Sequence, residues 1–223
     1  MSSSLLIKST HVSHDKEVTI DGTVFPSDAF TFSPQLSYTP IDRTSIMVPP
    51  LCYAVLTGSM EDVQDILTNS ERTEQFKNDL DDALFFADRS KSIGKGYLLL
   101  QAGANPGRPF SSNGLHGVAS QGLLGLIGSY VLCRNVPVDV RDKTLSTPIV
   151  YAMDLDSPHD WRTIEYLFKL GASPEAKVFH SGHTYAQIAR ERGKVELAQK
   201  LETYKGQDGP LCKESLYDLE MFI

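Results

Sequence analysis

The sequence predicts an all-α fold, a solenoid of stacked helical hairpins over about residues 46–204. Two observations support this prediction. A short motif recurs along the chain at a nearly constant interval, and each copy is followed by apolar residues three or four positions apart. Residues 1–45 and 205–223 do not follow the pattern. We therefore expect an N-terminal non-repeat segment, a stack of about five repeats, and a C-terminal tail or capping helix.

The clearest copy of the motif is the stretch Thr-Pro-Ile-Val-Tyr-Ala at positions 147–152. Thr147 suits the N-cap of a helix, and Pro148 suits its first position, where the missing N–H costs nothing. More degenerate copies lie at 50–54, 84–87, 114–118 and 184–189. The copies end at positions 54, 87, 118, 152 and 189, which are 33, 31, 34 and 37 residues apart. Five copies in one register predict five structural repeats.

A second helix is expected after each copy of the motif, because apolar residues follow at helical spacing. Two of these helices are expected to end just before Gly103 and Gly171, each followed within three residues by proline. Glycine favours the left-handed cap of a helix, and proline prevents the helix from continuing. The positions expected to face the interior are Val63, Ile66, Leu67, Tyr97, Leu99, Leu100, Ile127, Val131, Leu132, Ile164, Leu167, Phe168, Val195, Leu197 and Leu201.

With the Thr-Pro motif, the glycine exits and the interval near 33, residues 46–204 resemble the ankyrin repeat family. The resemblance covers about 160 of the 223 residues. The histidine of the family signature is retained only at His116, so most of the hydrogen bonds that it makes between neighbouring fingers are not expected here. The resemblance implies a module that mediates protein–protein interaction. Its partner, another protein, would lie in a concave groove and against the finger loops that connect successive repeats.

Positions that would contact this partner follow from the family's geometry, which presents the ends of the first helices and the tips of the fingers. Aromatic residues and arginines contribute disproportionately to interface energy, which singles out Phe110, Arg108 and Phe179 as anchors. The positions expected to bind a partner are Arg89, Arg108, Phe110, Gln121, Arg141, Asp154, Phe179 and His180.

An alternative interpretation is an enzyme or a small-ligand binder. Residues 17–20 and 23–25 flank an Asp-Gly pair, a strong signal for a β-hairpin that would dock on the stack as a cap or as a lid. Gly117, Gly125 and Gly128 occupy helical positions of the third repeat, which indicates either close helix packing or a cavity. If residues 1–45 form a lid, the expected pocket lies at this repeat, lined by Tyr53, Phe86, His116, Gly117 and Tyr151.

Composition and motifs restrict the remaining functions. The formal net charge of −7 argues against nucleic-acid binding, and no apolar run approaches the length of a membrane span. His180 and His183 lack a third ligand at a familiar spacing, so neither metal nor cofactor is expected. No active-site motif is recognisable, which leaves enzymatic activity open. Three widely spaced cysteines favour a reducing intracellular location, cytoplasmic or nuclear.

Overall fold

Helices make up most of the chain that the computed structural model describes, which comprises residues 18–20, 23–25, 36–38 and 46–204. The predicted all-α class is confirmed in this coarse sense. The helices are α1 (Pro50–Thr57), α2 (Met60–Asn69), α3 (Glu74–Arg89), α4 (Ile93–Gln101), α5 (Gly114–Ser120), α6 (Leu124–Gly128), the π-helix η2 (Ser129–Cys133), α7 (Pro148–Ala152), α8 (His159–Lys169), α9 (Tyr185–Glu191) and α10 (Val195–Thr203).

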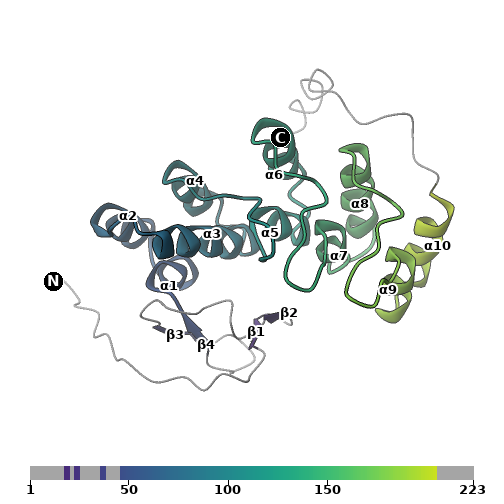
Figure 1. The fold of residues 1–223 in the computed structure, drawn as a ribbon, viewed down its shortest axis with the longest axis horizontal. Helices are drawn as coiled ribbons and strands as arrows, with labels where there is room; N and C mark the ends of the chain where they lie inside the picture. Colours follow the sequence, from purple (N-terminus) through teal and green to yellow (C-terminus); the bar gives the residue numbers. More distant parts are fainter. Residues whose placement is uncertain (1–17, 21–22, 26–35, 39–45, 205–223) are drawn as a thin grey trace.

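Consecutive helices lie in pairs, and the pairs follow one another along the long axis of the molecule (Figure 1). The first helices contact each other in the order α1, α3, α5, α7 and α9. Among the second helices, α2 contacts α4 and α6 contacts α8, with α4, α6 and α8 on the upper side in the figure. Each expected repeat therefore coincides with one pair of helices.

The first helices supply the centre of the core. Every residue of α5 and of α7 is buried. The buried apolar residues form one cluster from α1 to α4, which Tyr151 of α7 joins, and a second cluster from α5 to α10. Leu100 packs against both clusters. Apolar packing consequently continues from one pair of helices to the next.

Local caps fix where several helices begin. Reciprocal capping boxes start α2 at Ser59, α5 at Asn113 and α9 at Thr184, which satisfies amide groups that a helix leaves unpaired. Helix α7 has Thr147 at its N-cap, as predicted, but the hydroxyl of Thr147 contacts the Tyr185 hydroxyl at 2.8 Å and makes no cap hydrogen bond. This threonine joins two neighbouring pairs of helices.

The predicted glycine exits are confirmed. Gly103 and Gly171 have φ angles of 104° and 101°, and they follow the C-caps of α4 and α8. Glycine adopts this conformation without the steric penalty that a Cβ brings.

Two positions expected to be buried are exposed instead. Tyr97 is 62% exposed and Val195 is 57% exposed. In α4 the buried stripe is defined by Gly96 and Leu99, which are three residues apart, so the neighbouring Tyr97 points elsewhere. Val195 is the first residue of the last described helix, which has no later described helix to cover it.

The described strands form two short antiparallel pairs. Strand β1 (Val18–Ile20) pairs with β2 (Thr23–Phe25), and β3 (Leu36–Tyr38) pairs with β4 (Ile46–Val48). Residues 46–48, which we assigned to the repeat stack, are therefore strand, and the first helix begins at Pro50. Strand β3 contacts α1. The cap and lid alternatives for residues 1–45, and the expected capping helix in 205–223, lie largely outside the described residues.

Close packing of α3 on α5 gives the first testable prediction. A Cβ built on Gly117 would lie 2.9 Å from the Phe85 carbonyl oxygen and 2.9 Å from Asp88 Cβ. We expect Gly117→Ala to lower the free energy of unfolding by about 1–3 kcal/mol, because the backbone oxygen of Phe85 and the Cβ attached directly to the backbone of Asp88 cannot move away cheaply. The matched control is Gly94→Ala, whose Cβ meets only the flexible end of Met60 at 3.4 Å or more. Urea unfolding should show Gly94→Ala to be neutral or stabilising by up to about 1 kcal/mol. Equal effects of the two substitutions would contradict the packing.

Candidate functional site

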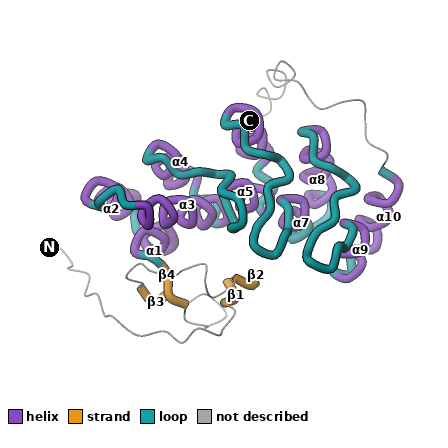
Figure 2. The backbone as a smooth tube through the Cα atoms, viewed as in Figure 1, coloured by secondary structure: helices purple, strands orange, loops and turns teal. Residues whose placement is uncertain are grey.

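Three long connections project from the row of helices. We call them finger 3 (residues 104–113), finger 4 (134–147) and finger 5 (171–184). Figure 2 shows fingers 4 and 5 descending beside α7 and α9 to the lower side of the molecule, away from α6 and α8. Each finger leads from the second helix of one pair to the first helix of the next. The fingers therefore form an edge alongside the first helices.

Each finger holds an apolar residue in the left-handed region of backbone space. The φ angles are 58° at Phe110, 64° at Leu145 and 57° at Phe179. This conformation costs a residue with a Cβ about 1–2 kcal/mol, and glycine would avoid the cost. Strain of this kind is maintained only where the surrounding structure fixes the backbone.

Hydrogen bonds between neighbouring fingers provide that support. The Phe110 amide of finger 3 donates to the Arg141 carbonyl oxygen of finger 4 over 2.7 Å. The Arg141 guanidinium in turn donates to the carbonyl oxygen of Lys177 in finger 5 over 2.8 Å, and to that of Leu145 over 3.4 Å. A continuous series of bonds thus joins the three fingers into one edge.

Within finger 4, the buried carboxylate of Asp142 fixes the turn. Its Oδ1 accepts hydrogen bonds from the Thr144 amide, the Thr144 hydroxyl and the Ser146 amide, each at 2.8 Å. Its Oδ2 accepts the Tyr151 hydroxyl of α7, also at 2.8 Å. The same hydroxyl lies 2.8 Å from Ser112 Oγ of finger 3. A buried charge with this many donors is well satisfied.

His116, the histidine of the expected signature, joins fingers 3 and 4. Its Nδ1 accepts from the Asn113 amide and its Nε2 faces the Ser146 carbonyl oxygen, both over 3.3 Å. Burial lowers the pKa of His116 to about 4, although the Asp142 carboxylate opposes the shift. The imidazole is therefore neutral near pH 7, with Nε2 donating to Ser146. These contacts make His116 a structural link between the two fingers.

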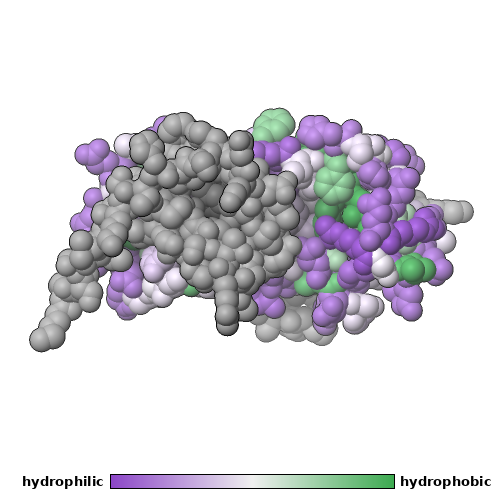
Figure 3. All heavy atoms as spheres, turned by 90° about the horizontal axis from the view of Figure 1, so that it is seen from below, coloured by the Kyte–Doolittle hydropathy of each residue, from purple (hydrophilic) through white to green (hydrophobic). Residues whose placement is uncertain are grey.

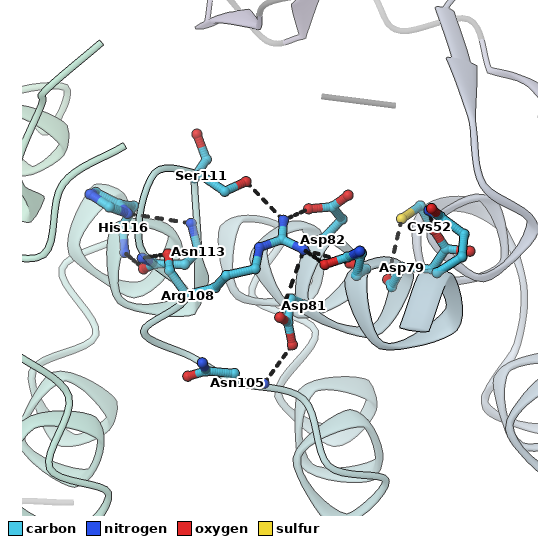
Figure 4. A network of polar contacts seen from close by, with 12 residues as sticks. Cys52, Asp79, Asp81, Asp82, Asn105, Arg108, Ser111, Asn113 and His116 are labelled. Atoms are coloured by element: carbon cyan, nitrogen blue, oxygen red, sulfur yellow. Dashed lines mark hydrogen bonds and ion pairs between the residues drawn. The ribbon is translucent and has the colours of Figure 1, made fainter. Parts of the chain in front are cut away.

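Arg108, an expected partner contact, is largely occupied within the molecule (Figure 4). Its guanidinium donates to the Asp82 carboxylate, to the Asn78 carbonyl oxygen at 3.0 Å and to Ser111 Oγ at 2.8 Å, and it lies 3.7 Å from Asp81. Burial raises the pKa of Asp82 to about 6 in spite of the nearby guanidinium. Arg108 thus anchors finger 3 to α3, and a role in partner binding stays a prediction.

The other expected contact residues fall into two groups. Phe110 is 67% exposed, His180 is exposed and Phe179 is half-buried, all on the fingers. Arg89 and Asp154 approach each other to 4.0 Å at the ends of α3 and α7, and Arg192 donates to Asp154 over 2.8 Å. Gln121 and Arg141 are partly buried. The structure therefore brings Arg89 and Asp154 together at helix ends, whereas Phe110, Phe179 and His180 lie on the fingers.

Four of the five expected pocket residues are packed in the interior. Phe86, His116, Gly117 and Tyr151 are buried, whereas Tyr53 is partly buried against the first cluster. The rings of His116 and Tyr151 lie 4.6 Å apart between centroids, and neighbouring protein atoms fill the space beside Gly117. The glycine-rich third repeat serves close packing at this point. A pocket under a lid would involve residues 1–45, most of which lie outside the described residues, so the small-ligand interpretation stays a prediction.

A buried acid at the centre of this packing had no counterpart among the expected site residues. Asp88 is 2% exposed, and its Oδ2 accepts the Tyr130 hydroxyl of η2 over 2.9 Å. A Cβ on Gly96, Gly114 or Gly117 would lie within 3.3 Å of this side chain. Burial raises the pKa of Asp88 to about 8, opposed by the bond from Tyr130. Of the three glycines expected at helical positions, Gly117 lies against Asp88, and it was the signal in the sequence for this site.

Comparisons with known proteins assign no family: no family model matches the chain, and no curated protein does. Within the part of the chain that the structure describes, no group of three or more His, Cys, Asp or Glu side chains is arranged to hold a metal ion. None of the described helices is both long and apolar enough to cross a bilayer.

The buried carboxyl of Asp88 predicts a distinctive dependence of stability on pH. Its pKa is about 8 in the folded chain, against about 3.9 for an unfolded aspartate. Between these values the unfolded state releases the proton that the folded state keeps. The free energy of unfolding should therefore fall as pH rises from about 4 to 8, by at most about 1.4 kcal/mol per pH unit from this group.

Asp88→Asn should remove this contribution, because the amide stays neutral and can still accept the Tyr130 hydroxyl. Urea unfolding from pH 4 to 9 should show the variant gaining stability over the natural protein as pH rises. Asp65→Asn, at an exposed position of α2, is the charge-matched control. A difference between Asp88→Asn and the natural protein that stays constant across pH would contradict the assignment.

Proposed function

We propose that this protein is an ankyrin-repeat module that binds another protein through its finger edge and the adjoining ends of its first helices. The repeated motif, the interval near 33 residues and one pair of helices per motif copy support the ankyrin assignment. A further support is His116, whose Nε2 reaches the Ser146 carbonyl oxygen of the next finger, the contact implied by the family resemblance.

The binding role rests above all on Phe110. Phe110 carries two free-energy costs in the isolated chain: its ring is 67% exposed to water, and its backbone is held at a φ of 58°. A partner that covers the ring would remove the cost of exposure, and the bond from the Phe110 amide to Arg141 already fixes the backbone. Aromatic residues presented on a rigid support are typical anchors of protein interfaces.

An intracellular location belongs to the same proposal. The two cysteines among the described residues, Cys52 and Cys133, are both free, and Cys52 is buried. Unpaired thiols are typical of proteins in a reducing compartment.

The experiment compares Phe110→Ala with Tyr97→Ala. Both rings are more than 60% exposed, but Tyr97 lies on α4, outside the fingers. Each variant is used to capture proteins from a lysate of the cells that produce the chain, with quantification by mass spectrometry. We expect Phe110→Ala to reduce recovery of a specific partner about tenfold and Tyr97→Ala to leave it unchanged. Thermal melting should show both variants folded, because surface substitutions usually change stability by less than about 0.5 kcal/mol. Equal recovery by the two variants would count against the finger edge.

A further inference from the structure

Three of the large apolar side chains exposed among the described residues gather on α2 and α4, two helices in contact with each other. Ile93 and Tyr97 are four residues apart on α4, so they lie side by side on one face of that helix. Met60 begins α2, and its Cε lies 3.4 Å from the position of a Cβ built on Gly94. We call Met60, Ile93 and Tyr97 the outer patch.

The outer patch is separate from the finger edge. Helix α4 lies on the upper side of the molecule in Figure 1, whereas fingers 4 and 5 descend to the lower side. The described strands also lie on the lower side, where β3 contacts the first helix α1. The fingers and the described strands therefore leave the outer patch uncovered.

The last pair of helices, α9 and α10, has a polar surface. The Arg190 guanidinium of α9 donates to the Glu202 carboxylate of α10 over 2.7 Å. Figure 3 shows mostly hydrophilic residues at this end of the lower side. Repeat stacks end in a unit with a polar outer face, so this pair already closes the stack. Its exposed polar residues include Gln187, Arg190, Glu191, Glu196, Gln199 and Glu202, and Val195 is its one exposed large apolar residue.

Beyond this pair the sequence continues with residues 205–223, which we call the tail and which lie outside the described residues. Leu216, Leu219 and Phe222 follow one another at three-residue intervals. This spacing is typical of one apolar face of a short helix, which needs an apolar surface to pack on. The polar surface of α9 and α10 offers little of it.

The tail starts close enough to reach the outer patch. The ring of Tyr204, the C-cap of α10, stacks on the ring of Phe168 in α8, with centroids 4.6 Å apart. Neighbouring helices pack 8–10 Å apart, and α6 lies between α8 and α4, so α4 is about 20 Å from α8. The stretch from Tyr204 to Leu216 spans up to about 40 Å when extended.

We propose that the outer patch binds the tail of the same chain, with Leu216, Leu219 and Phe222 packed on α2 and α4. A short helix with apolar residues at this spacing is a common ligand for a surface between two helices. This inference does not depend on the proposed function. It places the tail on the opposite side of the stack from the fingers, which leaves the finger edge open to a partner.

The size of the outer patch favours a short segment over a second copy of the stack. Stable dimers bury roughly 800 Å² on each partner, supplied by about 20–30 residues. Three exposed side chains on two neighbouring helices offer far less than this. A segment of the same chain needs less contact area, because its attachment supplies a high effective concentration.

Limited digestion of the full chain with chymotrypsin tests the contact. This protease cleaves after aromatic residues, and Tyr217 lies within the segment proposed to be bound. A synthetic peptide of residues 205–223 gives the rate for an unbound tail. We expect cleavage after Tyr217, followed by mass spectrometry, to be at least about tenfold slower in the full chain than in the peptide.

Two matched variants locate the bound tail without changing its sequence. Ile93→Asp should speed cleavage after Tyr217 about tenfold, because a charge replaces an apolar contact. Val195→Asp should change it by less than about twofold. Both side chains are 57% exposed, and each is the first residue of a nine-residue second helix, α4 or α10. Aspartate is favourable in the first turn of a helix, so melting curves should show both variants folded.

Several results would overturn the inference. Cleavage of the natural chain at the rate of the peptide would show that the tail is not bound. Acceleration by Val195→Asp alone would place the tail on the end of the stack, and acceleration by Phe110→Asp alone would place it on the finger edge. Equal acceleration by Ile93→Asp and Val195→Asp would indicate general destabilisation. Protection that increases with protein concentration would show that the tail comes from a second copy.

Discussion

Close contact between α3 and α5 is the constraint on which the finger edge depends. Gly114 and Gly117 present no side chain to α3, so the two helices approach until backbone and Cβ atoms would touch any added methyl group. Helix α7 then packs on α5, which is buried along its whole length. The packing of α7 on α5 places finger 3, which leads into α5, beside finger 4, which leads into α7, and their main chains are joined by the bond from the Phe110 amide to the Arg141 carbonyl oxygen.

Buried polar groups fix the positions of the fingers, in addition to the apolar packing of the helices. Asp142 and His116 lie where fingers 3 and 4 meet α7, and both are buried. Asp142 is stabilised by four hydrogen bonds, whereas His116 avoids the cost of a buried charge by staying neutral. Removing one partner of such a network leaves a buried group unsatisfied, so these contacts fix one arrangement of the fingers.

Local signals in the sequence predicted much of the fold. The correct predictions each depend on residues within a few positions of one another: the glycine exits at 103 and 171, the N-cap position of Thr147, and the apolar spacing of most second helices.

The predictions failed where the structure depends on other features. Tyr97 was misplaced because the buried stripe of α4 includes Gly96, and a pattern that counts apolar side chains does not detect a glycine. The strand at 46–48 pairs with residues 36–38 and had no local signal. The contacts that the sequence did not predict join residues about 26 to 42 positions apart: Arg108 with Asp82, Phe110 with Arg141, and Asp88 with Tyr130. Such contacts follow from tertiary packing, which single-residue patterns do not encode.

The account therefore depends most directly on the finger edge being held in place before any partner arrives. Amide hydrogen exchange at Phe110 in the isolated protein measures this, because an amide at an exposed loop tip exchanges at the rate of a free peptide unless it is bonded. The bond to Arg141 predicts exchange at least about tenfold slower than that rate. Exchange of the Phe110 amide at the free-peptide rate, with the amides of α5 still protected, would show that the fingers move independently and would contradict the account.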